Sequence, residues 1–363
     1  MRYFLIAGER SGDLHGSNLI KSLKKQDVQA AFSGIGGDQM QAAGMDIFIH
    51  YREMAFMGIV EVLQNLRSIR RNLKNTEKEI LRIRPDVVIM IDYGGFNMKL
   101  AARLKGKGIP IHYYISPKVW AWNQGRAWKL KRTVDQMLVI LPFEKDFFRR
   151  FDWNVEYVGN PVLDAVKDHV YNTDQSSTSQ VALLPGSRKQ ELKYMLPLME
   201  ELARAHPEWS FGLATVDNLD SRLYEDILNL ENVSAYKGHT YDLLKQSKAA
   251  VVTSGTATLE TALIKIPQVV IYRASPITYA IGSRLVKTPY ISLVNLIANK
   301  EVVIELLQDE MNLKNLDAEL SRLMNDGDYR NQMISAYDSI YDTLDVGRAS
   351  DNAARLIVRY LGD

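Results

Sequence analysis

The segment PDVVIMIDYGGFN, Pro85–Asn97, indicates the fold class of the chain. Its residues Val87–Ile91 are all apolar and lack the polar alternation of a half-exposed strand, which is typical of a strand that helices cover on both faces. Asp92, Gly94 and Gly95 follow at once and favour a turn into a helix. The segment therefore predicts one strand of a parallel sheet in an α/β domain.

Similar short apolar runs, separated by helical patterns, lie on both sides of this segment. Those in the first half are Tyr3–Ala7, Ala31–Phe32, Ile111–Ile115 and Met137–Leu141. Those in the second half are Val181–Leu184, Ser210–Ala214, Val233–Tyr236, Ala249–Thr253 and Val269–Tyr272. The repeated order of strand and helix predicts two Rossmann-like, doubly wound α/β domains.

A polar segment without sustained periodicity, DHVYNTDQSSTSQ at 168–180, is the predicted linker between these domains. The domains themselves are predicted at residues 1–167 and 181–345. Residues 346–363 carry apolar positions at helical spacing, so we expect a C-terminal helix that packs back on the first domain or on a partner subunit.

The composition limits the classes of protein to which the chain can belong. Its 363 residues are 46% hydrophobic and 24% charged with a net charge of +2, which indicates a globular protein and predicts no nucleic acid partner. Cysteine is absent and the six histidines are scattered, so we expect no metal site. No apolar run approaches the roughly 18 residues of a membrane-spanning helix or forms a signal peptide, which predicts a cytoplasmic protein.

Candidate functional residues follow the predicted strands, because ligands of open α/β sheets bind at the carboxyl ends of strands. In AGERSGDLHG, at 7–16, Gly12 permits a tight turn, and Ser11 or Asp13 is suited to cap the next helix. In the segment at 85–97, Asp92 is a candidate general base, followed by the polar residue Asn97. The alternatives are a structural turn for the first segment and a helix cap for Asp92.

Two further segments in the second half suggest a nucleotide diphosphate site. VALLPGSRKQE, at 181–191, ends a strand in Gly186, Ser187 and Arg188, where glycine lets backbone amides approach phosphates and arginine supplies a permanent positive charge. AAVVTSGTATLETAL, at 249–263, leads into a helix whose unpaired amides favour a pyrophosphate. The residues expected to contribute there are Ser254, Gly255, Thr256 and, for the ribose hydroxyls, Glu260. A solvated arginine is the alternative for Arg188.

Two surface features point to an anionic membrane surface or to ordinary packing. From Ile59 to Lys78 the apolar positions follow a helical period, and the other side of that helix carries Arg67, Arg70, Arg71, Lys74 and Lys78. The segment SPKVWAWNQGRAWKLKR, at 116–132, interleaves Trp120, Trp122 and Trp128 with basic residues. Such a segment can stack bases, lie at a lipid interface, or pack as core with a basic rim.

Together and in this order, these segments resemble the lipid-A-disaccharide synthase family over nearly the whole chain. The matching stretches are AGERSGDLHG, GIGG at 34–37, MGIVEV at 57–62, IDYGGFN, YYISPKVWAW at 113–122, LPFEKDFF at 141–148, VGNPVLD at 158–164, LLPGSR and SGTATLE.

The resemblance implies a GT-B fold, in which two Rossmann-like domains face each other across a cleft. It implies an inverting glycosyltransferase that moves 2,3-diacylglucosamine from its UDP derivative to the 6-hydroxyl of 2,3-diacylglucosamine 1-phosphate, giving lipid A disaccharide 1-phosphate and UDP. The family acts at the inner membrane surface without a cofactor or, as far as the fold type goes, a metal. Its C-terminal helices can exchange between subunits, which makes a homodimer an expectation for this chain.

Residue roles follow from the resemblance position by position. Asp92 matches the family's general base, Arg188 the arginine of its nucleotide loop, and Glu260 its ribose ligand. The remaining expected substrate or nucleotide contacts are Ser11, Gly12, Asn97, Gly186, Ser187, Ser254, Gly255, Thr256, Asn295 and Asn299, and the expected membrane or acceptor surface is Met57, Arg67, Arg70, Arg71, Trp120 and Trp122. The chain departs from the family pattern at Gly95, where an aspartate is frequent, and at Val294, where proline is usual.

Two other readings of the same residues stay open at this point. One is a different UDP-sugar enzyme of the same fold, such as another transferase or an epimerase, which needs no second sugar. The other is a non-catalytic protein that binds a membrane or a nucleic acid through the tryptophan and basic residues of 116–132, although the small net charge argues against nucleic acid.

Overall fold

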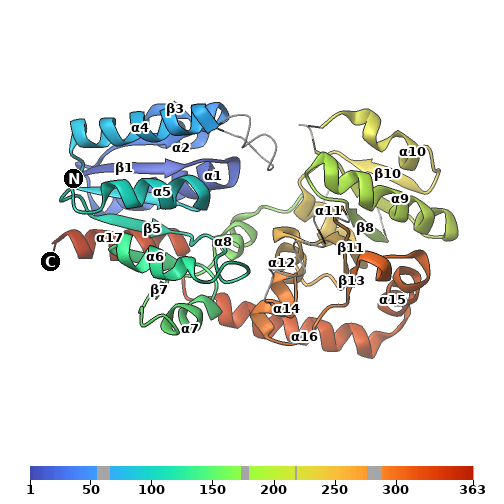
Figure 1. Cartoon of the computed structure of the whole chain (residues 1–363). Helices are drawn as coiled ribbons and strands as arrows, with labels where there is room; N and C mark the ends of the chain where they lie inside the picture. The colour runs from blue at the N-terminus through green and yellow to red at the C-terminus, as the bar shows by residue number, and fades with distance from the viewer. Residues whose placement is uncertain (55–65, 173–179, 217–218, 276–278, 280–287, 363) are drawn as a thin grey trace. The chain divides into compact units, whose positions relative to one another are not determined.

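The computed structural model describes all residues except 55–65, 173–179, 217–218, 276–278, 280–287 and 363 (Figure 1). The chain divides by its contacts into two compact units. The first unit is Met1–Pro161 together with Asp345–Asp363, and the second is Val162–Leu344. Each unit has its own sheet.

The first unit contains a parallel sheet of seven strands. These are β1 (Arg2–Ala7), β2 (Ala31–Gly36), β3 (Met45–His50), β4 (Val87–Ile91), β5 (Ile111–Tyr114), β6 (Gln136–Val139) and β7 (Glu156–Tyr157). Their order is β3-β2-β1-β4-β5-β6-β7. The chain thus winds outward from β1 in one direction and returns to β4 to wind in the other, so the switch point of the topology lies between β1 and β4.

Helices connect these strands, as parallel pairing requires. They are α1 (Arg10–Gln26), α2 (Asp38–Ala42), α4 (Leu66–Ile83), α5 (Gly94–Leu104), α6 (Arg126–Thr133), α7 (Phe143–Arg149) and the short η1 (Tyr51–Glu53) (Figure 1). The last helix, α17 (Ala349–Gly362), also belongs to this unit. It packs against α1, and Ser22 Oγ donates a hydrogen bond of 2.6 Å to Asp351. Its residues Ala353, Ala354 and Ile357 complete the core over Leu5 and Leu19.

The second unit repeats this architecture with six parallel strands. They are β8 (Val181–Leu184), β9 (Phe211–Ala214), β10 (Val233–Tyr236), β11 (Ala249–Thr253), β12 (Gln268–Tyr272) and β13 (Glu305–Leu307), in the order β10-β9-β8-β11-β12-β13. The switch point lies between β8 and β11. The helical segments are α8 (Pro161–Asp168), α9 (Lys189–Ala205), η2 (Ser221–Tyr224), α10 (Glu225–Leu228), α11 (Thr240–Gln246), α12 (Thr256–Leu263), α14 (Leu293–Ala298), η3 (Gln308–Glu310), α15 (Leu313–Asn325) and α16 (Gly327–Leu344).

The sequence pattern explains why these elements form. All five residues of β4 are buried, as its uninterrupted apolar run predicts. On α9 the buried residues recur at intervals of three and four, which places one apolar stripe against the sheet. The exposed Pro197 lies within this helix, outside that stripe.

Two boundaries differ from those predicted. The division between the units falls after Pro161 and not at 168–180, and the described start of that segment is bound to the second unit, because Asp242 accepts hydrogen bonds from His169 (2.8 Å) and from the backbone of Asn172 (3.1 Å). The tail is divided into α15, α16 and α17, and only α17 lies in the first unit.

Candidate functional site

Asp92 lies at the carboxyl end of β4, beside the switch point of the first sheet. Asp92 and Tyr93 both have left-handed backbones, with φ of 43° and 47°. The carbonyl oxygen of Asp92 accepts hydrogen bonds from the Tyr113 hydroxyl (2.6 Å) and the Asn97 amide (2.8 Å), while its backbone N–H points to the carbonyls of Tyr114 and Ile115. The backbone is therefore held from several sides, and the half-buried carboxylate is left available for chemistry.

The environment of Asp92 makes its carboxyl a stronger base than an exposed aspartate. Burial, and then the negative charge of Glu9, raise the pKa of Asp92 to about 6. The positive charge of Lys118 and the backbone N–H of Tyr93 act in the opposite direction. Glu9 was not among the residues singled out from the sequence, although its place in the loop that follows β1 was a usable signal.

The other predicted residues of the first unit have more structural roles. Asn97 is fully buried and supports the Asp92 backbone instead of reaching solvent. Gly12 is buried too, and a side chain there would crowd Ala7. Ser11 is exposed on the first turn of α1. Neither Ser11 nor Asp13 caps α1, because its N-cap residue is Glu9, without a side-chain hydrogen bond.

Asp13 instead ties α1 to another helix. Its carboxylate accepts hydrogen bonds from the backbone N–H groups of Gly37 (2.7 Å), Gln39 (3.1 Å) and Met40 (3.1 Å), at the start of α2. A buried carboxylate is stable there because it satisfies the free amides of the helix start and interacts with the helix dipole.

The tryptophans at 116–132 separate into buried and exposed residues. Trp120 is 6% exposed and packs edge-on against Phe143, so the prediction that it belongs to a membrane or acceptor surface is wrong. Trp122 is 43% exposed, with the Arg126 guanidinium 4.6 Å from its ring centre, and Trp128 is 45% exposed beside Lys131. Only these two present aromatic surface to solvent.

A buried carboxylate, Glu144, joins the loop after β5 to the start of α7. It accepts hydrogen bonds from the hydroxyl of Ser116 and from the backbone N–H groups of Ile140 (3.2 Å) and Leu141 (2.9 Å). Burial raises the pKa of Glu144 to about 7, against the opposing effect of these hydrogen bonds. The residue fixes the loop that carries Trp120 and Lys118.

In the second unit, the start of α9 is closed by the chain itself. The Glu191 carboxylate accepts hydrogen bonds from the backbone N–H groups of Ser187 (2.9 Å) and Arg188 (3.2 Å) and pairs with the Arg188 guanidinium (3.2 Å). Gly186 has φ of 101°, and a Cβ there would lie 2.4 Å from Glu191. Gly186 thus makes room for the Glu191 carboxylate. The amides that were predicted to bind a phosphate donate to this carboxylate instead.

The start of α12 has no such cap. Its N-cap residue is Gly255, without a side-chain hydrogen bond, and a Cβ built on Gly255 meets no atom within 4 Å. Gly255 and Thr256 are exposed, and Ser254 Oγ donates to the carbonyl of Ile291 (3.2 Å). Within the described part of the chain no side chain caps these amides, and a helix start of this kind at the carboxyl end of β11, beside the switch point, is suited to bind an anion.

Glu260 lies one turn into α12 and is oriented by a neighbouring helix. The Tyr241 hydroxyl of α11 donates a hydrogen bond of 3.0 Å to its carboxylate. Burial raises the pKa of Glu260, and the hydrogen bond from Tyr241 opposes this shift. Burial and the charge of Glu260 raise the pKa of Tyr241, so this phenol stays a hydrogen-bond donor.

The two asparagines predicted near this site are parts of the scaffold. The side chain of Asn295 is fully buried; it donates to Val303 and Glu305 and accepts from the backbone of Val302 and Val303, so its hydrogen-bonding capacity is used within the unit. Asn299 ends α14 with a left-handed backbone. Glycine is the most frequent residue at such a position, and asparagine is the next. Val294, on the same helix, is buried.

Helix α4 presents a basic face. Arg67, Arg70 and Arg71 are exposed, as are Lys74 and Lys78, and no ion pair involves them within the part of the chain that the structure describes. Leu73 and Ile80 are buried on its other side. Met57 lies outside the described residues. Among the described helices, none combines the length and apolarity needed to cross a bilayer.

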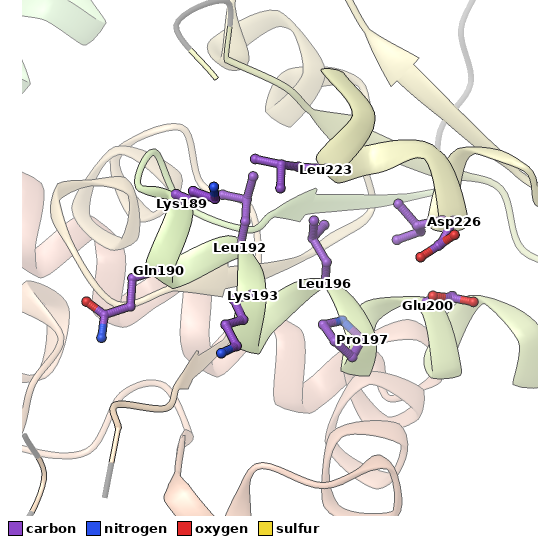
Figure 2. A pocket seen from close by; sticks show the side chains of 10 residues that line it. Lys189, Gln190, Leu192, Lys193, Leu196, Pro197, Glu200, Leu223 and Asp226 are labelled. Carbon is purple, nitrogen blue, oxygen red and sulfur yellow. The ribbon is translucent and has the colours of Figure 1, made fainter. Parts of the chain in front are cut away.

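A pocket of about 580 Å³ lies elsewhere on the second unit, between α9 and the segment of η2 and α10. Figure 2 shows Leu192 and Leu196 of α9 opposite Leu223, with Glu200 and Asp226 at one end. Its lining combines aliphatic side chains with the lysines and the glutamine of the start of α9 and with Glu200 and Asp226. In the described ranges no group of three or more metal-ligating side chains occurs.

Comparisons with known proteins agree with this arrangement. A model of the family described as lipid-A-disaccharide synthetase matches residues 3–358. The lipid-A-disaccharide synthase of Syntrophus aciditrophicus is 38% identical over 96% of this chain and 95% of its own length. That of Coxiella burnetii (strain CbuG_Q212) is 35% identical over 97% and 96%.

Solved structures show the same fold at low identity. The glycotransferase of kitacinnamycin is 15% identical with a TM-score of 0.66 and covers 99% of each chain. The UDP-GlcNAc 2-epimerase of Neisseria meningitidis, bound to UDP-GlcNAc, is 14% identical with a TM-score of 0.64, over 99% of each chain. The two parallel sheets with flanking helices are thus a GT-B type fold. The chain belongs to the lipid-A-disaccharide synthetase family and is a glycosyltransferase of lipid A biosynthesis.

Proposed function

We propose that this chain transfers 2,3-diacylglucosamine from its UDP derivative to the 6-hydroxyl of 2,3-diacylglucosamine 1-phosphate, with inversion at the anomeric carbon. One observation supports the roles given to the two units. Asp92, whose pKa is raised, lies beside the switch point of the first sheet, and the start of α12, which has no side-chain cap, lies beside the switch point of the second. The family membership supports the reaction itself.

The second unit binds the donor in this proposal. The free amides at the start of α12 hold the diphosphate, and Glu260 accepts hydrogen bonds from the ribose hydroxyls. Arg188 leaves Glu191 to neutralise charge on the departing UDP. That exchange costs little, because the guanidinium is two-thirds exposed and such surface pairs contribute at most about 1 kcal/mol.

The first unit binds the acceptor and carries out the proton transfer. Asp92 takes the proton of the 6-hydroxyl as its oxygen forms the new bond to the anomeric carbon. The bond from that carbon to the diphosphate breaks on the opposite face, and UDP leaves with the electron pair. A single displacement of this kind inverts the anomeric centre.

The lipid substrates suggest where the enzyme works. We propose peripheral binding to the cytoplasmic face of the inner membrane through the basic face of α4, assisted by Trp122. We also retain the proposal of a homodimer formed by exchange of C-terminal helices, in which α17 of one subunit makes the contacts with α1 that it makes here within one chain.

The test is an assay of UDP release with donor alone and with donor plus acceptor, each in excess EDTA. The proposed transferase releases UDP only when both lipid sugars are present, and chelator leaves the rate unchanged because Arg188 and the α12 amides stabilise the diphosphate. UDP release from the donor alone would favour an epimerase or hydrolase, and loss of activity in EDTA would contradict the metal-independent mechanism.

A further inference from the structure

The sheet order places two loops on either side of Asp92. Strand β4 lies between β1 and β5, so the loops that follow those strands flank the residue that follows β4. Glu9 comes two residues after the end of β1, and Ala7 pairs with Ile91 in the sheet. Lys118 follows the end of β5, and Ile91 pairs with Tyr114.

Close backbone packing fixes both loops. A Cβ on Gly8 would lie 2.2 Å from the ring of Tyr93, so the loop that carries Glu9 packs directly on the residue after Asp92. A Cβ on Gly94 would lie 2.6 Å from Pro117, so the loop that carries Lys118 packs on the start of α5. These contacts hold the two charged residues near Asp92.

Neither charge is used by the fold nearby. Glu9 is the N-cap residue of α1, yet its side chain makes no capping bond. Across the described residues, no hydrogen bond or ion pair engages the Glu9 carboxylate or the Lys118 ammonium, whereas the neighbouring Glu144 is satisfied by three donors. The charge of Glu9 acts on Asp92 without a compensating partner, and a perturbed carboxylate of this kind is typical of a functional site.

We propose that Glu9 and Lys118 are positioning residues that bracket Asp92 and set the charge state and orientation in which it accepts the proton of the acceptor hydroxyl. The inference rests on the proposed role of Asp92 as general base. Glu9 increases the affinity of Asp92 for the proton as the new glycosidic bond forms. Lys118 keeps Asp92 ionised before the acceptor hydroxyl transfers its proton.

The two effects have opposite signs, and this makes the inference testable. The negative charge of Glu9 raises the pKa of Asp92, and the positive charge of Lys118 lowers it. Among the described residues, the other titratable groups next to Asp92 are Tyr93 and Tyr113, and burial raises the pKa of both phenols, so they remain uncharged in the range of the test.

The experiment is the pH dependence of kcat/KM, which reports the ionisation of the free enzyme. For the unmodified enzyme, kcat/KM falls as the pH drops through about 6, where Asp92 becomes protonated. Glu9→Gln moves this acid limb to lower pH and Lys118→Met moves it to higher pH, each by about one pH unit. Glu9→Asp and Lys118→Arg keep the charges and should keep the limb near its original position.

Exposed charges in the same unit provide matched controls. Lys99→Met on α5 and Asp46→Asn on β3 change the net charge equally and should leave the limb in place. The inference would be overturned if the acid limb of kcat/KM stayed in place in Glu9→Gln and Lys118→Met. It would also be overturned if the acid limb moved by the same amount in the controls. A raised KM for the acceptor with an unmoved limb in Lys118→Met would also overturn it and would make Lys118 a contact of the acceptor phosphate.

Failure of the inference can be distinguished from failure of the proposed function. If Asp92→Asn is inactive while the limbs stay in place, Asp92 remains the base and only the roles of Glu9 and Lys118 are lost. If Asp92→Asn turns over normally, the assignment of the base is itself wrong.

Discussion

At the scale of single residues, Asp92 and Tyr93 show that the fold accepts strain at the position of the proposed base. A left-handed backbone at a residue other than glycine costs about 1 kcal/mol or more, and here two such residues are adjacent. The buried Asn97 amide and the Tyr113 hydroxyl both bind the Asp92 carbonyl. They therefore stabilise the left-handed backbone of Asp92.

The substitution Asp92→Asn tests the base directly. Asparagine keeps the shape of the side chain but cannot accept the proton, so we expect turnover to fall by roughly 10²–10⁴-fold with nearly unchanged UDP affinity. Steady-state kinetics and calorimetric titration of UDP measure the two quantities. Circular dichroism and melting curves serve as the folding control, and a wild-type rate in folded Asp92→Asn would make Asp92 a structural residue.

Donor binding is tested at Glu260 and its partner. Glu260→Ala removes the carboxylate that accepts from the ribose, so UDP should bind more weakly by about 1.5–3 kcal/mol. Tyr241→Phe removes only the hydroxyl that orients Glu260, and the expected loss is smaller, about 0.5–1.5 kcal/mol. Calorimetric titration with UDP measures both losses, and unchanged UDP binding in Glu260→Ala would exclude it as a ligand.

Residue types and their place after strands were enough to select Asp92, Glu260 and Arg188, because those signals are local in the sequence. The roles of Asp13 and Trp120 were not predictable in this way. Asp13 binds amides 24 or more residues away, and the burial of Trp120 depends on Phe143. Partners that are distant in sequence leave no trace in local spacing.

At the scale of secondary structure, α9 and α12 start at equivalent places in one sheet but differ in their caps. Glu191 closes the start of α9, whereas α12 is left open. A helix start without a side-chain cap loses about 1 kcal/mol of stability, which a bound anion can restore. UDP binding is therefore expected to stabilise the second unit.

Helix α4 gathers exposed cations on one side. Arg67, Arg70 and Arg71 are exposed there, while Leu73 and Ile80 are buried on the other side. A basic amphipathic helix of this kind is suited to lie on an anionic membrane surface.

Replacement of these arginines tests the membrane proposal. Changing Arg67, Arg70 and Arg71 to Ser should weaken binding to vesicles that contain anionic lipid, since each basic residue near such a surface contributes about 1 kcal/mol. Sedimentation with vesicles measures this. Changing Lys105, Lys107 and Arg149 to Ser is the control with equal charge, and equal losses in both variants would show a non-specific effect.

The sequence predicted the central strands better than the edge strands. The bounds of β4, β8 and β11 are as expected, because strands buried on both faces are continuous apolar runs. The bounds of β10 are also as expected, although it lies at an edge of its sheet and is only partly buried. Strands β3, β7 and β13 were missed. They lie at the edges of the sheets and two of them are three residues or shorter, so neither length nor pattern distinguished them.

At the scale of the whole molecule, the chain passes from the first unit to the second and then returns. The returning segment, Asp345–Asp363, contains α17, and Tyr360 of α17 contacts the buried His112 of β5. Both ring nitrogens of His112 lack a hydrogen-bond partner among the described residues, and the ring lies edge-on to Tyr360 with centroids 4.6 Å apart. This attachment of α17 therefore requires a neutral imidazole.

The attachment should weaken in acid. Burial lowers the pKa of His112 to about 4, below its value of about 6.5 in the unfolded chain, so its stability contribution is complete above pH 6.5 and is lost as the pH falls toward 4. The full loss is about 3 kcal/mol. Melting curves from pH 6.5 to 4.5 should show a smaller decrease for His112→Phe than for the wild type.

His206 of the second unit gives a comparison of opposite sign. Burial lowers the pKa of His206, but hydrogen bonds with Glu208 and Asp317 outweigh this effect, and the net change is an increase. The stabilisation that His206 provides is therefore present below pH 6.5 and is lost as the pH rises. If His112→Phe melts with the same pH dependence as the wild type, the histidine does not govern the attachment.

The return of α17 has a consequence for how the protein is made. Residues 162–344 form a compact unit of consecutive sequence, so a ribosome can release everything this unit needs before translation reaches residue 345. The first unit lacks Ala353, Ala354 and Ile357 of its core until α17 has been synthesised. The nascent polypeptide is therefore expected to carry a folded second unit while the first unit, with the proposed base Asp92, is still incomplete.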